Sequence, residues 1–318
     1  MQFGVIVPQG WRLDLVDFPD PVDAYEAMTR VAREAEALGF RSIWLYDHFH
    51  TVPVPTQEVT FEAWMSTAAL ARDTQRVRIG QIVTCNSYRH PALLAKMAST
   101  VDVLSHGRLI LGLGAGWYEQ EYHAYGYEFP PTAERLARLG EALQVLLAMW
   151  TQEEASFEGR YYQVRGAINQ PKGVQQPHIP ILIGGSGEKV TLRLVALYGD
   201  ACNLGGDVET VRHKLAVLRQ HCEAVGRDYE SIWRTVIIDE CAIAESEAEA
   251  VAKLRPEQRA NLEHLRRTQL IGTPETIRAR IAEYEALGVQ ELIIRFVDAA
   301  TNPESLQLFA RTCLPPST

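Results

Sequence analysis

The sequence predicts an α/β fold of the (β/α)₈ TIM-barrel class, built as a single domain over residues 1–318. Eight short apolar runs recur along the chain, and each ends in a small or polar cluster. Most of these runs are followed by a segment of helical length, which is the alternation that such a barrel requires. The chain of 318 residues is longer than the roughly 250 residues typical of this fold, so insertions are expected.

The predicted strands are the eight apolar runs. They cover residues 3–7, 42–45, 78–83, 109–113, 179–183, 201–204, 233–238 and 292–296. In a parallel barrel all strand ends face the same way, so the small and polar clusters that follow them converge on one face. The sequence therefore predicts one pocket at that face.

The predicted helices show a 3.6-residue apolar period, and several end at a glycine or begin at a proline. They cover residues 23–38, 91–104, 134–150, 188–198, 208–225, 274–287 and 303–312. No fixed period of similar residues accompanies the alternation, which disfavours a solenoid.

Two stretches interrupt this alternation. Residues 157–171 combine aromatic and β-branched residues around a glycine, which predicts a small hairpin before the fifth strand. Residues 245–269 are charged, rich in alanine and helical in pattern, and we expect them to pack outside the seventh strand near the pocket mouth. Either insertion can be a lid over the pocket or ordinary surface decoration.

Composition excludes several classes of function. The net charge of −9 and a pI near 5.5 disfavour nucleic acid and anionic membranes as partners. Five cysteines without a Cys-x-x-Cys pair argue against a disulfide framework or a zinc site. The sequence has neither a secretion signal nor an apolar run of about 18 residues, so we expect a cytoplasmic protein.

Glycines follow the fourth predicted strand at Gly112, Gly114 and Gly116. A dinucleotide-binding fingerprint needs a third glycine where this chain has Trp117, so that motif is absent. Gly114 and Gly116 instead predict a place where a planar ring approaches the strand end closely. A tight turn is the alternative explanation.

Two more glycine clusters precede helices on neighbouring strands. Gly184, Gly185, Ser186 and Gly187 form the first, and Gly205 with Gly206 forms the second. The amide groups at two helix N-termini would together bind a phosphate group. Turn formation explains either cluster equally well when it is taken alone.

Asp47 and His48 end the second predicted strand. An imidazole there can hold or move a proton beside a bound ring, while the carboxylate orients it or binds ligand. His50 raises a metal alternative, but no third ligand follows at a recognisable spacing, so no metal site is predicted. A histidine that is simply hydrogen-bonded is the other explanation.

Aromatic and charged residues follow the third and fourth strands. They are Tyr88, Arg89, His90, Trp117, Tyr118, Glu119 and Glu121. Trp117, Tyr118 and Glu119 are expected to line a substrate pocket above a flat cofactor, although several of the set can merely pack helices together. Motifs of serine hydrolases, zinc proteases and nucleotide kinases are missing, which leaves hydride or oxygen chemistry on a bound ring.

Over almost its whole length the chain resembles the luciferase-like flavin and deazaflavin oxidoreductases. The resemblance rests on residues 3–9 and 39–48, and above all on two more specific matches, His90–Lys96 with Ser105–Leu109 and Gly112–Trp117. Residues 180–187, 199–201 and 271–275 are also similar. Asp47-His48 and the Gly-x-Gly-x-Gly-Trp strand end followed by Glu119 resemble the branch that uses the deazaflavin coenzyme F-420.

The resemblance implies a pocket for F-420 or reduced FMN and, in most members, a homodimer. It places Asp47 and His48 near the ring, Val83 and Thr84 beneath it, Gly114 and Gly116 beside it, and Gly184, Gly185, Gly205 and Gly206 around the phosphate. It also implies a non-proline cis peptide near Ile82-Val83. Trp117 stands where sugar-phosphate dehydrogenases of the branch have a catalytic glutamate, which favours a more apolar substrate.

The leading hypothesis is an F-420-dependent oxidoreductase that transfers a hydride to or from a small organic substrate, with His48 assisting proton transfer. The alternative is an FMN-dependent monooxygenase that receives reduced flavin from a separate reductase and consumes oxygen. A third hypothesis is a non-catalytic flavin-binding protein.

Overall fold

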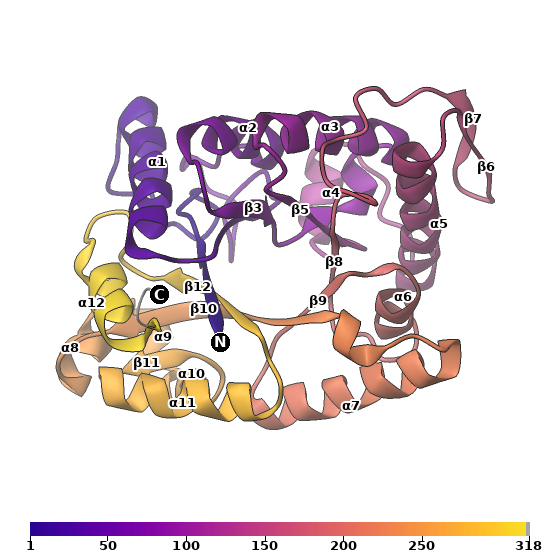
Figure 1. Ribbon diagram of the computed structural model, residues 1–318. Coiled ribbons are helices and arrows are strands. Elements are labelled where there is room, and N and C mark those ends of the chain that lie inside the picture. The colour runs from indigo at the N-terminus through magenta and orange to yellow at the C-terminus, as the bar shows by residue number, and fades with distance from the viewer. Residues whose placement is uncertain (316–318) are drawn as a thin grey trace.

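The computed structural model, which describes residues 1–315, confirms the barrel (Figure 1). Eight positions around the barrel carry parallel strands in the order β1-β2-β3-β5-β8-β9-β10-β12, and β12 pairs with β1 to close it. The strands are β1 (Gln2–Ile6), β2 (Ser42–Leu45), β3 (Arg78–Gln81), β5 (Leu109–Gly114), β8 (Ile181–Gly184), β9 (Ala201–Leu204), β10 (Trp233–Ile243) and β12 (Glu291–Phe296). A short strand, β11 (Leu270–Gly272), extends the sheet beside β10.

Helices surround the barrel, as Figure 1 shows. The longer ones are α1 (Pro21–Leu38), α2 (Ala63–Asp73), α3 (Pro91–Leu104), α5 (Thr132–Thr151), α6 (Thr191–Tyr198), α7 (Val208–Val225), α11 (Pro274–Ala286) and α12 (Glu304–Cys313). Two 3₁₀ turns, η1 (Asn86–Tyr88) and η2 (Tyr229–Ser231), complete the connections. No described helix is both long enough and apolar enough to cross a membrane.

The strands bury both of their faces, as a parallel barrel requires. Ile6, Trp44, Ile110, Leu182 and Ile293 point into the barrel and form its inner core. Their neighbours along the strands, such as the fully buried Val5, Ile43 and Leu111, belong instead to the layer under the helices. Continuous apolar runs in the sequence therefore correspond to strands without a solvent face.

The third strand differs from its predicted extent. Residues 78–83 are not one regular strand, because a non-proline cis peptide joins Ile82 to Val83 and pairing resumes only at β4 (Thr84–Cys85). The cis peptide expected at this place is thereby confirmed.

The hairpin predicted within residues 157–171 is present as β6 (Ala155–Glu158) and β7 (Gln163–Ala167). It lies beside α5, where the Glu141 carboxylate accepts the backbone N–H groups of Arg160, Tyr161 and Tyr162 at 2.8, 2.8 and 3.0 Å. This insertion is therefore fixed to the outer helix layer.

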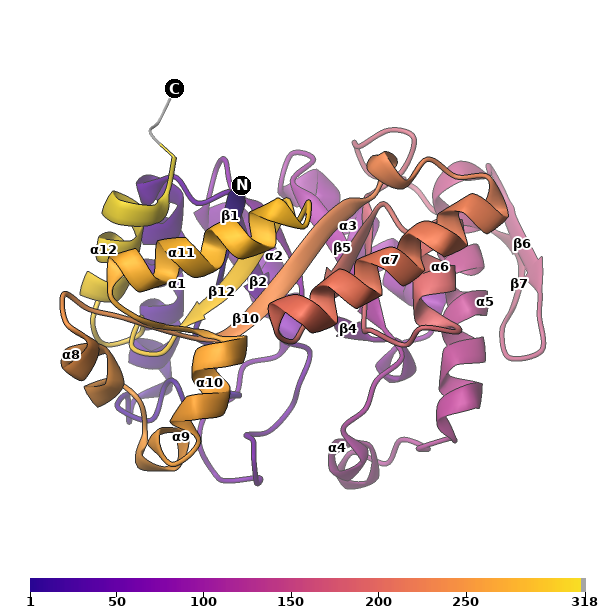
Figure 2. The same ribbon diagram turned by 90° about the horizontal axis from the view of Figure 1, so that it is seen from below.

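The second insertion contains α8 (Glu247–Ala252), α9 (Pro256–Arg259) and α10 (Leu262–Thr268). Figure 2 shows α9 and α10 at the same end of the barrel as α4 (Glu119–Ala124), opposite the end where the N-terminus lies. Arg255 donates from Nη1 to the Arg12 carbonyl at 3.1 Å, which connects this insertion to the loop after β1.

Three details of the helices were not predicted. α2 and α4 are absent from the predicted set, and α6 begins at Thr191 rather than at residue 188. α4 is six residues long, which is too short for a periodic pattern to appear. The later start of α6 leaves residues 185–190 as a loop after β8.

Candidate active site

Two adjoining cavities lie at the carboxyl ends of the barrel strands. The His48 cavity, of about 260 Å³, is lined by Trp11, Arg12, Tyr46, Asp47, His48, Ile82, Val83, Thr84, Cys85, Tyr88, Gly116, Trp117, Tyr118, Ile237 and Asp239. The glycine cavity, of about 370 Å³, is lined by Ile82, Val83, Gly114–Trp117, Thr132, Leu136, Gly184–Gly187, Thr191, Asn203 and Ile237. Five residues belong to both linings, so the two cavities share one wall. Strand ends from most of the barrel thus converge, as the sequence predicts.

His48 is held by a buried carboxylate. Its Nδ1 lies 2.8 Å from Oε2 of Glu121, which is fully buried on α4. The same carboxylate accepts the Tyr88 hydroxyl at 2.9 Å and the backbone N–H groups of Phe49 and His50 at 2.7 and 3.3 Å. Burial by itself would raise the pKa of Glu121, but the hydrogen bond and the charge of His48, together with the bonds from Phe49 and Tyr88, outweigh it and lower that pKa below its ordinary value.

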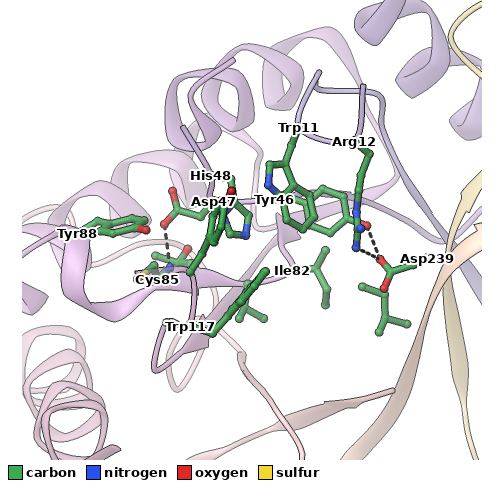
Figure 3. Close-up of a pocket in the computed structure, with 15 residues that line it drawn as sticks. Trp11, Arg12, Tyr46, Asp47, His48, Ile82, Cys85, Tyr88, Trp117 and Asp239 are labelled. Carbon is green, nitrogen blue, oxygen red and sulfur yellow. Dashed lines mark hydrogen bonds and ion pairs between the residues drawn. The ribbon is translucent and has the colours of Figure 1, made fainter. Parts of the chain in front are cut away.

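Aromatic rings fix the plane of the His48 imidazole. Trp11 stacks on it with ring centroids 4.1 Å apart and an interplanar angle of 2°. Trp117 and Tyr118 meet it edge-on at 5.8 and 5.9 Å. Figure 3 shows His48 between Trp11 and Trp117 at the edge of the cavity. The ring is therefore held both by a hydrogen bond and by packing.

The Asp47 carboxylate makes structural interactions with neighbouring segments. Arg89 forms a bidentate ion pair with it at 2.7 and 3.0 Å, and the Cys85 backbone N–H donates to it at 2.8 Å. Arg89 also pairs with Glu62 at the start of α2, at 2.6 Å. Asp47 contributes to the cavity wall, but its carboxylate ties the end of β2 to β4 and α2.

A charge-balanced group forms the far wall of the His48 cavity. Asp239 pairs with Arg12 at 3.3 Å and accepts the Tyr46 hydroxyl at 2.8 Å (Figure 3). Burial, followed by the charge of Asp239, raises the pKa of Tyr46 well above its ordinary value, so this phenol stays neutral. The Arg12 guanidinium also lies 4.4 Å from the Trp11 ring. Among the residues described, Arg12 is the one arginine or lysine in this lining, and its charge is already paired.

Val83, which follows the cis peptide, packs into a hollow made by glycines. A Cβ atom placed on Gly114 or Gly184 would lie 2.7 Å from a Val83 methyl group, whereas one on Gly112 would first meet the Gln81 carbonyl oxygen at 1.8 Å. Gly116 has a different reason to be glycine, since its φ is +77° and a Cβ would meet the Tyr122 hydroxyl at 1.9 Å. These glycines accommodate protein side chains, and through Val83 they shape the wall that both cavities share.

The turn after β8 offers free backbone donors. Gly185 has a φ of +115°, and the amides of Ser186 and Gly187 have no protein acceptor within residues 1–315. Gly205 and Gly206 follow β9 nearby but line neither cavity, and the Asp207 side chain caps α7 by accepting the Thr210 N–H at 2.9 Å. Free amides for an anion therefore come from the β8 turn, whereas the N-terminus of α7 already holds its own carboxylate.

The structure brings together most of the predicted site residues. Thr84, Trp117 and Tyr118 line the His48 cavity, and Ser186 lines the glycine cavity. Glu119, expected on the pocket wall, lines neither cavity; its side chain is 66% exposed and lies 3.4 Å from His123. The acidic group that reaches the site is Glu121, because α4 turns that position inward.

Trp11, Arg12 and Ile237 were not expected as lining residues, whereas Tyr46 and Asp239 belong to the clusters that follow the second and seventh predicted strands. Trp11 and Arg12 lie in the loop after β1, and they carry no local motif. Their position directly after the first strand was the available signal. Within residues 1–315 no group of three or more His, Cys, Asp and Glu side chains is arranged to hold a metal ion.

Comparison with known proteins identifies the family. The model of the luciferase-like monooxygenase family matches residues 1–264. The chain belongs to this family. The family and its structural relatives are oxidoreductases and monooxygenases, so the protein is an enzyme of that kind.

Individual relatives include F-420-dependent and FMN-dependent proteins. An F-420-dependent glucose-6-phosphate dehydrogenase of Mycolicibacterium fortuitum is 32% identical over 252 residues, covering 74% of this chain and 73% of that enzyme. An F-420-dependent secondary alcohol dehydrogenase bound to an F-420–acetone adduct superimposes with a TM-score of 0.82 at 21% identity, covering 98% and 97% of the two chains. The 3,6-diketocamphane monooxygenase of Pseudomonas putida in complex with FMN gives 0.76 at 18% identity, covering 100% and 99%. The two structures share the fold with this luciferase-like chain.

The cavities of this luciferase-like protein suit a flat ring with an anionic tail. The His48 cavity has aromatic and aliphatic walls, and the glycine cavity next to it ends at amides that lack protein acceptors. A ring over Val83 would place its tail toward Ser186 and Gly187.

Proposed function

We propose that this protein is an F-420-dependent oxidoreductase that transfers a hydride between the coenzyme and a small organic alcohol or carbonyl compound. The observation that carries the proposal is the position of His48, which is fixed by Glu121 and faces a cavity that adjoins the glycine cavity. The relation to an F-420-dependent dehydrogenase at 32% identity supports the choice of coenzyme.

In this proposal, Val83 and Thr84 lie beneath the deazaflavin ring, Gly114 and Gly116 lie beside it, and Asp47 braces the strand ends around it. The free amides of Ser186 and Gly187 bind the phosphate of the tail, Gly184 and Gly185 form the turn that presents these amides, and Gly205 and Gly206 lie at the neighbouring strand end. When bound, the coenzyme accepts or gives a hydride at its ring carbon C5.

The chain itself supplies orientation and proton transfer. His48 exchanges the proton of the substrate oxygen, while Trp11, Trp117 and Tyr118 hold the substrate and exclude water. The charge of Arg12 is balanced by Asp239, so the His48 cavity favours an uncharged and largely apolar substrate over a sugar phosphate. The family resemblance further supports a homodimer.

The test is a pair of titrations, one with F-420 and one with reduced FMN. Binding is monitored by quenching of tryptophan fluorescence, since Trp11 and Trp117 line the cavity. We expect saturable binding of F-420 and turnover of a secondary alcohol without oxygen consumption. In His48→Gln the turnover should fall by roughly 10²-fold or more while the coenzyme still binds.

Other outcomes distinguish the remaining candidates. Preferential binding of FMN with oxygen uptake would identify an FMN-dependent monooxygenase that requires a separate reductase. Binding without turnover for either coenzyme would identify a non-catalytic flavin-binding protein. Full activity in His48→Gln would remove that residue from the proposed mechanism.

A further inference from the structure

Glu121 can act toward His48 only as a hydrogen-bond acceptor. Oε2 receives His48 and Tyr88, and Oε1 receives the two backbone N–H groups of Phe49 and His50. These four donors stabilise the ionised carboxylate, in line with the lowered pKa of Glu121. An ionised carboxylate has no proton to donate, so Nδ1 of His48 must carry the proton that joins them.

This bond determines the chemistry of the other ring nitrogen. With the proton on Nδ1, the neutral imidazole presents a lone pair at Nε2. Within the part of the chain that the structure describes, Nε2 has no hydrogen-bond partner, and the ring lines the cavity. Stacking on Trp11 prevents the ring from turning away. The free acceptor therefore faces the place where a substrate oxygen would lie.

We propose that Glu121 is a positioning residue that holds His48 in the Nδ1–H tautomer, so that Nε2 accepts the hydroxyl proton of the substrate and the resulting imidazolium is stabilised by the adjacent carboxylate. This inference rests on the proposed function for its substrate. In alcohol oxidation the O–H proton passes to Nε2 and the hydride from the adjacent carbon passes to F-420, which leaves a carbonyl product. In the reverse direction the imidazolium returns the proton.

Burial and ion pairs occupy the other ionisable side chains around His48. Burial raises the pKa of Tyr46, Tyr88 and Tyr118, and it raises that of Cys85 to about 12. The remaining charged residues of the cavity form the pairs Arg12–Asp239 and Asp47–Arg89. His50, whose Nε2 lies 4.0 Å from Glu121 Oε1, is the other imidazole beside this carboxylate. If activity changes with pH, a comparison of His48 and His50 variants therefore shows which imidazole causes the change.

The first experiment measures the tautomer directly in the wild-type protein, without coenzyme. Protein labelled with ¹⁵N-histidine contains nine imidazoles, and the His48 signals are assigned by their loss in His48→Gln. We expect a protonated Nδ1 and an unprotonated Nε2 at neutral and higher pH. The opposite tautomer in the folded wild-type protein would overturn the proposal, even if the enzyme proves active.

The second experiment uses Glu121→Gln, whose amide can donate to Nδ1 and so favours the wrong tautomer. We expect kcat to fall by roughly 10²–10⁴-fold with a much smaller change in KM. The acidic limb of the kcat profile should move to lower pH, because the imidazolium loses its neighbouring negative charge. In His50→Gln that limb should stay where it is in the wild type.

Glu128→Gln is the matched control, since the Glu128 side chain is 86% exposed in the loop after α4, and it should keep the wild-type kcat and tautomer. A low kcat in Glu121→Gln with an unchanged His48 tautomer would show a merely structural role and overturn the proposal, as would an unchanged kcat. If the wild type turns over no substrate, the proposed function fails while the spectrum still decides the role of Glu121.

Discussion

At the scale of single residues, a buried carboxyl group makes stability depend on pH. Glu291 lies 1% exposed inside the barrel, where Ser42 donates to it and Trp44 in turn donates to Ser42. Burial raises the pKa of Glu291 to about 7, although the bond from Ser42 and the charge of Arg41 oppose the shift. The folded state therefore keeps a proton that the unfolded chain releases at lower pH.

The raised pKa of Glu291 makes the folded protein less stable as the pH rises. Between the ordinary carboxyl pKa near 4.5 and the folded value of about 7, the folded protein binds more protons, so its stability falls as pH rises. Glu291→Gln removes the titration and should be more stable than the wild type above pH 7, by at most about 3 kcal/mol. Below pH 4.5 the wild type and Glu291→Gln should have the same free energy of unfolding.

Urea unfolding curves at pH 4, 6 and 8 measure this difference in unfolding free energy. The exposed Glu153→Gln serves as control and should show no such trend. A constant difference between wild type and Glu291→Gln at all three pH values would contradict the assignment.

At the scale of elements, the packing of β4 against β5 and β8 depends on small residues. The Val83 side chain fills the space left by Gly114 and Gly184, and a methyl group at either position would come within 2.7 Å of it. A β-branched side chain has little rotamer freedom with which to yield. The cost of overpacking here should be about 1–3 kcal/mol.

Gly184→Ala is therefore expected to lower the free energy of unfolding and to weaken coenzyme binding by moving Val83. Adding Val83→Ala should restore part of the stability, since it removes the methyl groups that collide. Gly140→Ala is the control, because its added Cβ would meet nothing closer than a Leu194 methyl at 3.4 Å. Additive effects in the double variant would show that the two sites do not share this packing.

The strands and helices also differ in how well the sequence predicted them. Apolar runs located all eight barrel strands, because parallel strands bury both faces and need no alternation. α2 escaped prediction since Ala63–Asp73 is dominated by small residues and lacks a usual capping residue; Glu62 caps it instead. In the site, His48 was expected from its place at a strand end and Val83 from a family resemblance. Glu121 was expected only as one of several residues after the fourth strand, because its bond to His48 depends on tertiary packing that no local pattern encodes.

At the scale of the whole molecule, charge disfavours anionic substrates. The chain carries a net charge of −9, and Arg12 in the His48 cavity is already paired with Asp239. With saturating coenzyme, a neutral secondary alcohol should therefore show a kcat/KM at least about tenfold above that of its phosphorylated analogue. Initial rates for the matched pair at two ionic strengths test this, and equal use of both at low salt would contradict it.

The segment of residues 117–121 contains both the carboxylate that binds His48 and two aromatic side chains that line the cavity. Glu121 makes the hydrogen bond from this segment to His48, whereas the neighbouring Trp117 and Tyr118 meet the imidazole edge-on and line the cavity wall. Natural or laboratory diversification of those two positions can remodel which molecules are accepted while the proton-handling machinery stays intact. Randomised libraries for new substrates should accordingly vary residues 117 and 118 and leave residue 121 untouched.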